Sequence, residues 1–476
     1  MIGITSVGAY IPMYRLSRNE IGKMWRTRGG DGEKAVAGYD EDTVTMAVAA
    51  ALDCIGRSEN GVGALYLATT TSPYLEKQSA ATIARAVDLD RHCHTADFTN
   101  SLRAGMSAMK SAMDAVSAGS VGQVAVVASD CRIGAPRGIL EQNLGDGAAA
   151  LTIGSSGVIA AIEGSYSISH DFTDLWRTDH DAFPRSGEAR FIEEVGYTPS
   201  MQEAMSGLME KYSMNPKDFS KVVFYGPHNR AHADLAKKLG FDKSQVQDTL
   251  FSRIGNTGTA AAFIMLVAAL EEAKKGEAIL FAAYGDGADA FVLRATEQAK
   301  NIRREPTMEQ RTAGKVNIDY GTYLYWRELV PVEASGLPER AEPSLATRWR
   351  ERKNISALYG FKCNKCGTPQ LHPIGQNMRI CVACQAKDDF EPYKFSDKTG
   401  KLFTYAIDQL QPTRNPPGLN GVIDFDGGGR LICELTDYDI EKAHVGMPVK
   451  MTFRKLAQGN GIVNYYWKAK PFAKGV

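Results

Sequence analysis

The sequence predicts an α/β protein in which a duplicated α/β domain is followed by a cysteine-bearing ribbon and a small antiparallel β-barrel. Three observations predict it. Strands and amphipathic helices alternate through roughly the first 300 residues. The motif GDGAAA at 145–150 returns as GDGADA at 285–290, each time after a small-residue helix and a strand. Two CxxC pairs at 363–384 precede segments in which apolar and polar residues alternate.

Composition limits the classes of protein that the chain can belong to. Its 476 residues exceed what one hydrophobic core accommodates, so we expect two or three domains. Lys+Arg and Asp+Glu are both 55, which gives no sign of a nucleic-acid or membrane partner. The longest apolar run, 259–270, is too short for a membrane span. Eight cysteines without an evenly spaced framework, and no signal-like N-terminus, predict a cytoplasmic protein.

The first half is predicted over residues 1–165. It begins with a strand at 2–11, and Asp42 is a suitable N-cap for a helix at 43–55. Further along, a strand at 62–72, a helix at 78–89 and a strand at 121–130 alternate, and a glycine turn follows at 145–154. The polar, glycine-bearing stretch 15–39 is predicted to be a surface excursion.

The second half, 166–297, repeats this order. A helix at 201–214, a strand, loop and helix at 221–241, and a glycine turn entering a buried helix at 253–276 lead to a strand–turn–strand at 277–296. Two unrelated glycine hairpins would be an alternative explanation. Duplication is favoured because the preceding helix and strand repeat as well.

Residues 95–116 predict a short strand, a tight elbow and a helix. The apolar residues of this helix recur at steps of four and three, and its alanines form a second, small-residue face, so it can pack on two sides; the apolar stripe is Leu102, Met106, Met109, Met113 and Val116. The segment, with NSLRAG at 100–105, resembles the nucleophile elbow of the thiolase superfamily, in particular the 3-hydroxy-3-methylglutaryl-CoA synthase and type III ketoacyl synthase branch. The resemblance implies a thiolase-like α/β/α/β/α fold, a CoA thioester substrate and a cysteine nucleophile, where this chain has Leu102.

The same resemblance implies two further site residues. His228, in YGPHNR, and Asn256, in GNTG, correspond to the His and Asn that face the nucleophile and hold the thioester carbonyl. Two donors aimed at one oxygen stabilise an oxyanion or an enolate. The alternatives are that His228 is a loop histidine without a task and that Asn256 is a residue favoured by its turn.

Other candidates for the chemistry are weaker. No glutamate stands in the loop where hydroxymethylglutaryl-CoA synthases keep their general acid; Glu76 is nearest and is expected on the surface. Cys93 and Cys131 do not replace the nucleophile, and we expect both to be buried or merely structural.

Regular periodicity fails over 298–354, which predicts a linker that lies across the first domain through the aromatic residues at 320–329. A basic cluster in this linker either forms a solvated face or holds a CoA phosphate; its members are Arg348, Trp349, Arg350, Arg352 and Lys353.

The cysteine pairs predict a metal site. Two CxxC knuckles separated by fourteen residues offer four thiolates, a set that prefers zinc or iron in a closed, structural site; the four are Cys363, Cys366, Cys381 and Cys384. Disulfides within each pair are the alternative. We expect a zinc ribbon at 355–392 with structural Zn²⁺. The alternating segments of 393–476 predict an OB-fold. Ribbon and OB-fold together resemble the auxiliary domain of many thiolase-like enzymes that act on acyl-CoA.

Two classes of function follow. In the first, an enzyme makes or breaks a C–C bond next to a CoA thioester, through an enolate held by His228 and Asn256. In the second, a non-catalytic thiolase-like subunit binds or shuttles acyl-CoA for a cysteine-bearing thiolase partner. The retained donors favour the enzyme, and the missing nucleophile favours the subunit. We expect at least a homodimer, since thiolase-like domains pair through a sheet edge and 62–71 is a candidate edge strand.

Overall fold

The structure, a computed structural model, describes residues 1–56, 61–302, 306–333, 344–372, 374, 378–459 and 461–472. The chain divides into two compact units. The first runs from Met1 to Leu329 without two short segments, and the second comprises Val330–Val476 with those segments, Gly38–Glu41 and Arg85–Asp88. Parts of the predicted linker (303–305, 334–343), ribbon (373, 375–377) and barrel (460, 473–476) lie outside the described residues.

The first unit is built on a mixed sheet with the strand order β11-β12-β13-β8-β1-β7-β6-β4-β5. The strands are β1 Gly3–Tyr10, β4 Ala64–Thr69, β5 His94–Thr99, β6 Gln123–Cys131, β7 Asp146–Gly154, β8 Ala160–Ser169, β11 Lys221–Phe224, β12 Ala278–Tyr284 and β13 Gly287–Ala295. The two repeated glycine motifs lead into β7 and β13, each antiparallel to the strand before it. The segment predicted as a glycine turn at 145–154 is therefore mostly a buried strand.

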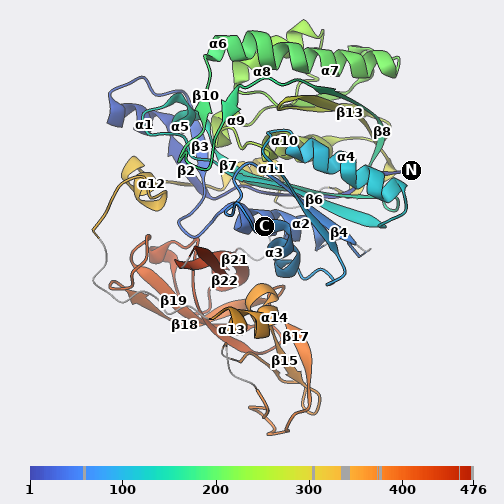
Figure 1. Ribbon diagram of the computed structural model, residues 1–476. Coiled ribbons are helices and arrows are strands. Elements are labelled where there is room, and N and C mark those ends of the chain that lie inside the picture. The colour runs from blue at the N-terminus through green and yellow to red at the C-terminus, as the bar shows by residue number, and fades with distance from the viewer. Residues whose placement is uncertain are drawn as a thin grey trace. The chain divides into compact units, whose positions relative to one another are not determined.

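Helices cover and divide this sheet, so that the first unit has five layers (Figure 1). Helices α4 (Ala104–Ser117) and α10 (Ala260–Glu272) are central: α4 packs on β4 and β6, while α10 packs on β7 and also on β11. The outer layers are α2 (Thr43–Ile55), against β1 and β7, and α7 (Thr198–Lys211), against β8 and β13. This arrangement is the predicted α/β/α/β/α fold, in which the helix after the elbow is packed on two sides.

Residues 15–39 are not the surface excursion that their polarity suggested. Strands β2 (Tyr14–Ser17) and β3 (Glu33–Val36) pair with each other, and β14 (Val316–Asn317) pairs with β2. Lys34 is almost fully buried, because its ammonium group donates to Tyr323 Oη at 3.1 Å and lies over the Tyr323 ring. Tyr323 belongs to α12 (Tyr320–Trp326), whose aromatic side chains cover this small sheet.

The strand at 62–71, predicted to be a sheet edge, lies inside the sheet. β4 pairs in parallel with β5 on one side and with β6 on the other, and all six of its residues are buried. A continuous apolar run of this kind is typical of a parallel strand covered on both faces. The edge is β5 instead.

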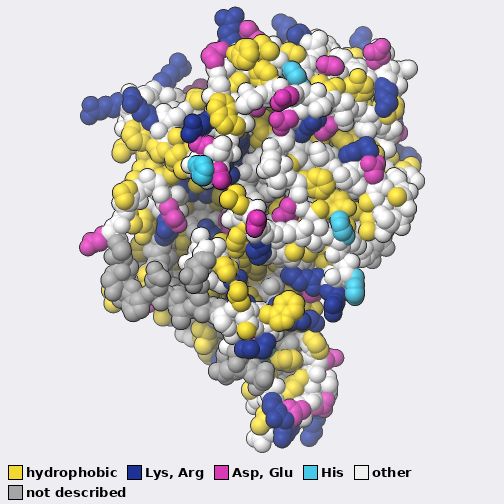
Figure 2. Space-filling model, viewed as in Figure 1, with side chains coloured by type: hydrophobic (Ala, Val, Ile, Leu, Met, Phe, Trp, Pro, Cys, Tyr) yellow, Lys and Arg dark blue, Asp and Glu magenta, His cyan; other side chains and the backbone are white. Residues whose placement is uncertain are grey.

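Shorter elements complete the first unit: α1 Arg18–Trp25, α3 Ser79–Ala86, α5 Ile139–Asn143, β9 Leu175–Trp176, β10 Arg185–Ser186, α6 Ala189–Phe191, α8 Asn229–Lys238, α9 Phe251–Ile254 and α11 Met308–Ala313, with a π-helical turn at Ile192–Tyr197 and 3₁₀ turns at Pro216–Asp218 and Glu297–Asn301. Asp42 caps α2 in a reciprocal box with Thr45, as predicted. No helix among the described residues is long and apolar enough to cross a membrane. On the face of this unit shown in Figure 2, acidic and basic side chains are interspersed.

The second unit contains a ribbon and a barrel. The ribbon sheet has the order β16-β15-β17, and the barrel has the order β20-β19-β18-β21-β22. The elements are α13 Leu345–Arg350, α14 Arg352–Ala357, β15 Tyr359–Cys363, β16 Pro369–Gln370, β17 Phe390–Lys394, β18 Thr399–Asp408, β19 Gly418–Phe425, β20 Arg430–Glu434, a 3₁₀ turn Ile440–Lys442, β21 Pro448–Gly459 and β22 Ile462–Pro471. Trp467, 1% exposed, packs edge-on against Phe453 in the barrel core. The predicted antiparallel barrel is confirmed.

Candidate active site

The elbow between β5 and α4 is held in place by the second half of the first unit. Asn100 adopts a left-handed conformation (φ 71°), which turns the chain sharply after β5. The Arg103 guanidinium donates to the carbonyls of Ile168 (2.7 Å) and Asp286 (2.9 Å). The predicted elbow is therefore present, and it lies against the turn that joins β12 to β13.

Leu102 is half-buried at this elbow and packs against the hydrophobic core. A leucine side chain offers neither a nucleophile nor a hydrogen bond. Beside it, the buried Ser101 hydroxyl oxygen has no hydrogen-bond partner within the described part of the chain. No side chain caps the N-terminus of α4, so its first peptide N–H groups remain directed toward the elbow.

Asn256 is buried in the glycine turn that leads into α10. Its Nδ2 donates to Tyr225 Oη at 2.8 Å, and its Oδ1 accepts a hydrogen bond from the Gly258 backbone at 3.0 Å. Gly258 has φ of 64°, a conformation that favours glycine. The turn thus fixes the amide so that its nitrogen, rather than its oxygen, faces the tyrosine.

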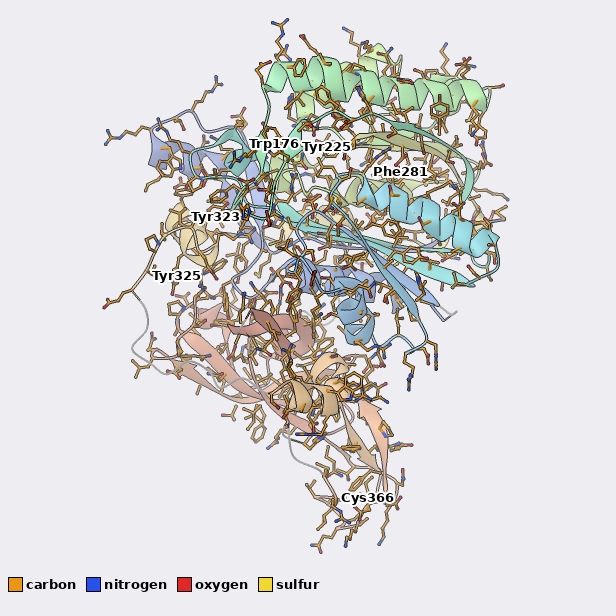
Figure 3. The ribbon with its side chains drawn as sticks, viewed as in Figure 1. Trp176, Tyr225, Phe281, Tyr323, Tyr325 and Cys366 are labelled. Atoms are coloured by element: carbon orange, nitrogen blue, oxygen red, sulfur yellow. The ribbon has the colours of Figure 1, made fainter. Side chains whose placement is uncertain are left out.

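Tyr225, directly after β11, is the site residue that the sequence reasoning missed (Figure 3). Its backbone is fixed by the Tyr197 hydroxyl, which donates to its carbonyl at 2.9 Å, and by its own N–H, which donates to Ala282. Burial raises the pKa of Tyr225, so the phenol keeps its proton at neutral pH. A signal existed: the two strands of the second half end in Tyr-Gly, at 225–226 and 284–285.

His228 lies at a different kind of position. It is the N-cap of α8, where its Nδ1 accepts a hydrogen bond from the Ala231 N–H at 3.3 Å, and its Nε2 is 3.5 Å from Glu193 Oε2. Its side chain is 40% exposed. Within the described residues, no hydrogen bond joins His228 to Asn256. The structure therefore brings Asn256 together with Tyr225, and a role for His228 stays a prediction.

The remaining candidates are placed as follows. Glu76 is exposed. Cys93 is half-buried, and its thiol donates to the His94 carbonyl at 3.5 Å. Cys131 is half-buried at the end of β6, where the Arg327 guanidinium donates to its sulfur at 2.9 Å.

Four cysteines of the second unit form a candidate metal centre. Their sulfur atoms all lie within 4.8 Å of one another, with Cys363–Cys384 at 3.7 Å and Cys366–Cys381 at 3.6 Å. A tetrahedral zinc with Zn–S bonds of 2.3 Å requires sulfur atoms about 3.8 Å apart, so the set fits a closed S₄ site. Both knuckles are closed by backbone hydrogen bonds, from Gly367 to Cys363 and from Gln385 to Cys381. Cys366 is labelled in Figure 3.

Comparison with known proteins identifies the family. Residues 209–294 match the family model of the C-terminal domain of 3-oxoacyl-[acyl-carrier-protein] synthase III, and residues 393–454 match that of the C-terminal OB-fold domain of ChsH2. The hydroxymethylglutaryl-CoA synthase of Methanopyrus kandleri is 33% identical over 340 residues, which span 68% of this chain and 96% of the relative. The chain belongs to the hydroxymethylglutaryl-CoA synthase family. Another member, from Aeropyrum pernix, is 36% identical over 337 residues, 67% of this chain and 92% of that one.

Solved structures of hydroxymethylglutaryl-CoA synthases share the fold of the first unit. A synthase complexed with CoA has a TM-score of 0.62 at 17% identity and matches 68% of this chain and 89% of its own. A second, in complex with 3-hydroxy-3-methylglutaryl coenzyme A, has a TM-score of 0.62 at 20% identity and matches 72% and 94%. The predicted thiolase-like fold class and the resemblance to this family are confirmed.

Proposed function

We propose that this member of the hydroxymethylglutaryl-CoA synthase family acts on acyl-CoA and makes or breaks a C–C bond next to the thioester without forming an acyl-enzyme. The observation that carries the proposal is the hydrogen-bonded pair of Asn256 and Tyr225 near an elbow that bears Leu102. The names of the relatives support a CoA thioester as substrate, as does a solved relative that holds 3-hydroxy-3-methylglutaryl-CoA.

The pair suits the stabilisation of an enolate. Asn256 spends one amide N–H on the Tyr225 oxygen, so its second N–H and the Tyr225 O–H are two donors on neighbouring residues. Both side chains are buried, at 7% and 5% exposure, where hydrogen bonds to developing negative charge are strong. Aldol, retro-aldol and decarboxylation reactions pass through such an enolate, and none of them needs a cysteine.

A non-catalytic role is the second candidate function. A leucine at the elbow and an exposed Glu76 leave the site with neither a nucleophile nor a carboxylic acid from that loop. In that case the protein holds or shuttles acyl-CoA for a cysteine-bearing thiolase subunit. The partner's activity would then be indifferent to the donor pair.

Exchange of the α-protons of an acyl-CoA in D₂O distinguishes the two functions. We expect the purified full-length chain to exchange the α-protons of acetyl-CoA or acetoacetyl-CoA, because exchange reports the enolate alone. Asn256→Ala and Tyr225→Phe should each slow exchange on the order of 10²- to 10³-fold, as when one oxyanion donor is lost. NMR or mass spectrometry measures the exchange.

His228→Ala is the informative third variant. We expect it to exchange nearly as fast as the wild type, because its ring nitrogens are engaged with the α8 cap and Glu193. Exchange lost in His228→Ala and retained in Tyr225→Phe would make His228 the second donor. No exchange by the wild type with any acyl-CoA would contradict the enzyme and favour the partner function.

We further propose that the four cysteines hold a structural zinc ion. Their sulfur–sulfur separations fit a tetrahedral site, and a fourth thiolate closes the coordination shell against a substrate. The zinc would stabilise the ribbon and take no part in the reaction.

A further inference from the structure

A buried tyrosine hydroxyl beside the elbow is not used by the donor pair. Tyr284 ends β12 and is 3% exposed, and its Oη has no hydrogen-bond partner among the described residues. Leaving a buried hydroxyl unpaired costs about 1–3 kcal/mol. Native structures rarely keep such a group unless it has a use, so the hydroxyl points to a ligand.

The neighbouring backbone places this hydroxyl at the elbow. A Cβ on Gly285, the next residue, would lie 2.7 Å from Ser101 Oγ and 3.0 Å from the Leu102 nitrogen. Only glycine can therefore follow Tyr284 at this distance from the elbow. On another side, a Cβ on Gly196 would lie 2.9 Å from Tyr284 Oη, so the missing side chain leaves room around the hydroxyl.

The phenol ring is held and its charged neighbour is identified. Tyr197 packs edge-on against the Tyr284 ring at 5.4 Å between centroids. Burial, and then the Asp174 carboxylate, raise the pKa of Tyr284 well above its usual value, so the phenol is protonated at neutral pH. Burial also raises the pKa of Asp174, a half-buried residue between β8 and β9, which makes its carboxylate easier to protonate.

We propose that Tyr284 is a catalytic residue that exchanges a proton with the β-oxygen of a β-hydroxyacyl-CoA, and that Asp174 positions it and receives or returns that proton. The proposal rests on the proposed function and names its substrate class. It follows from an unpartnered buried hydroxyl next to the elbow and near the Asn256–Tyr225 pair.

In the cleavage direction the step balances as follows. The β-hydroxyl gives its proton to Tyr284 as Tyr284 passes its own proton to Asp174. The β-carbon–oxygen bond becomes a carbonyl, and the bond between the α- and β-carbons breaks. Its electron pair forms the thioester enolate, held by Asn256 and Tyr225. Asp174 releases its proton to water, and water protonates the α-carbon. The synthetic direction is the reverse, and no oxidant or reductant is needed.

The test uses the full chain, with 3-hydroxy-3-methylglutaryl-CoA as a β-hydroxyacyl probe and acetyl-CoA for α-proton exchange. Tyr284→Phe keeps the ring and loses only the hydroxyl. We expect it to slow retro-aldol cleavage of the probe by about 100-fold or more, as for the loss of an acid–base group. It should leave α-exchange within about threefold of wild type. Its melting temperature should be equal or higher, because no hydrogen bond is lost.

Two further variants sharpen the result. Tyr212→Phe is the matched control: its hydroxyl accepts a hydrogen bond from the Ser165 N–H, so this change should lower stability and leave both reactions near wild type. Asp174→Asn should slow cleavage and leave α-exchange. Unchanged cleavage in Tyr284→Phe, or α-exchange that falls in proportion to cleavage, would overturn the proposal.

Affinity separates failure of this proposal from failure of the proposed function. If the wild type neither exchanges nor cleaves, the proposed function is wrong, yet the contact with the β-oxygen is still measurable by calorimetry. Tyr284→Phe should then weaken binding of the probe about tenfold, the loss of one hydrogen bond, without weakening binding of CoA itself. Equal losses for the two ligands, or none, would overturn the proposal.

Discussion

At the scale of the residue, the elbow combines an electrostatic arrangement for a thiolate with a side chain that cannot form one. The uncapped N-terminus of α4 favours negative charge, and Leu102 answers it with an apolar wall. The same field favours a negatively charged oxygen on a bound thioester. Asn256 and Tyr225 supply hydrogen bonds for such an oxygen, so the chemistry that remains open is that of an enolate.

Intact-mass spectrometry tests the elbow directly. After incubation with acetyl-CoA, we expect the wild-type chain to carry no acyl adduct, because a leucine cannot be acylated. Leu102→Cys should gain the mass of one acyl group, since a helix N-terminus lowers the pKa of a thiol. Leu102→Ala is the control and should remain unmodified. A wild-type adduct would contradict the prediction, and peptide mapping would then assign it to Cys131 or Cys93.

At the scale of the element, the ribbon of β15, β16 and β17 has little apolar core of its own. Cys363 and Cys381 are buried, and each begins a knuckle, so the thiol cluster takes the place that a hydrophobic core fills elsewhere. Metal binding in such a small element contributes directly to its folding.

We therefore expect one zinc ion per chain by elemental analysis. The double variant Cys363→Ala, Cys381→Ala should lose the metal and become protease-sensitive at the ribbon, while the barrel resists. Cys433→Ala is the matched control: Cys433 is a buried cysteine of β20, outside the cluster, and its loss should leave the metal content unchanged. An intact ribbon without metal, or another metal in stoichiometric amount, would refute the assignment.

At the scale of the whole molecule, the two edges of the central sheet differ. The outer side of β11 is covered, because Val222 exchanges backbone hydrogen bonds with Gln245 and Gln247. No backbone ladder covers the outer side of β5 among the described residues, and its side chains are half-buried or exposed. An uncovered edge strand is a template for pairing with another chain.

We predict a homodimer that pairs through β5. Light scattering should return twice the mass of the chain. In hydrogen exchange, the amides of His94–Thr99 should be protected at high protein concentration and lose protection on dilution, whereas Lys221–Phe224 in β11 should not change. A monomeric mass, or concentration dependence at β11 instead of β5, would contradict this interface. A second thiolase-family subunit would appear as a heavier complex only when that protein is added.

Much of the fold is determined by local pattern, and so is the metal site. The period of α4, the Asp42 cap of α2 and the alternation of β18–β22 each arise within a few turns or strands. The four cysteines of the ribbon are close in sequence, so their spacing alone brings them together. Asn256 was predicted because its glycine turn is also local, and the elbow was predicted for the same reason.

Tertiary structure decided the partners that come from distant segments. Tyr225 meets Asn256 because the register of β11 beside β12 sets how far the strand reaches, whereas His228, three residues later, is already part of the α8 cap. Likewise β4 and β5 are told apart as interior and edge only by strand order. The polar stretch with Lys34 is buried only because α12, nearly 300 residues away, covers it. Sequence patterns determine what a segment can form; long-range packing determines what it faces.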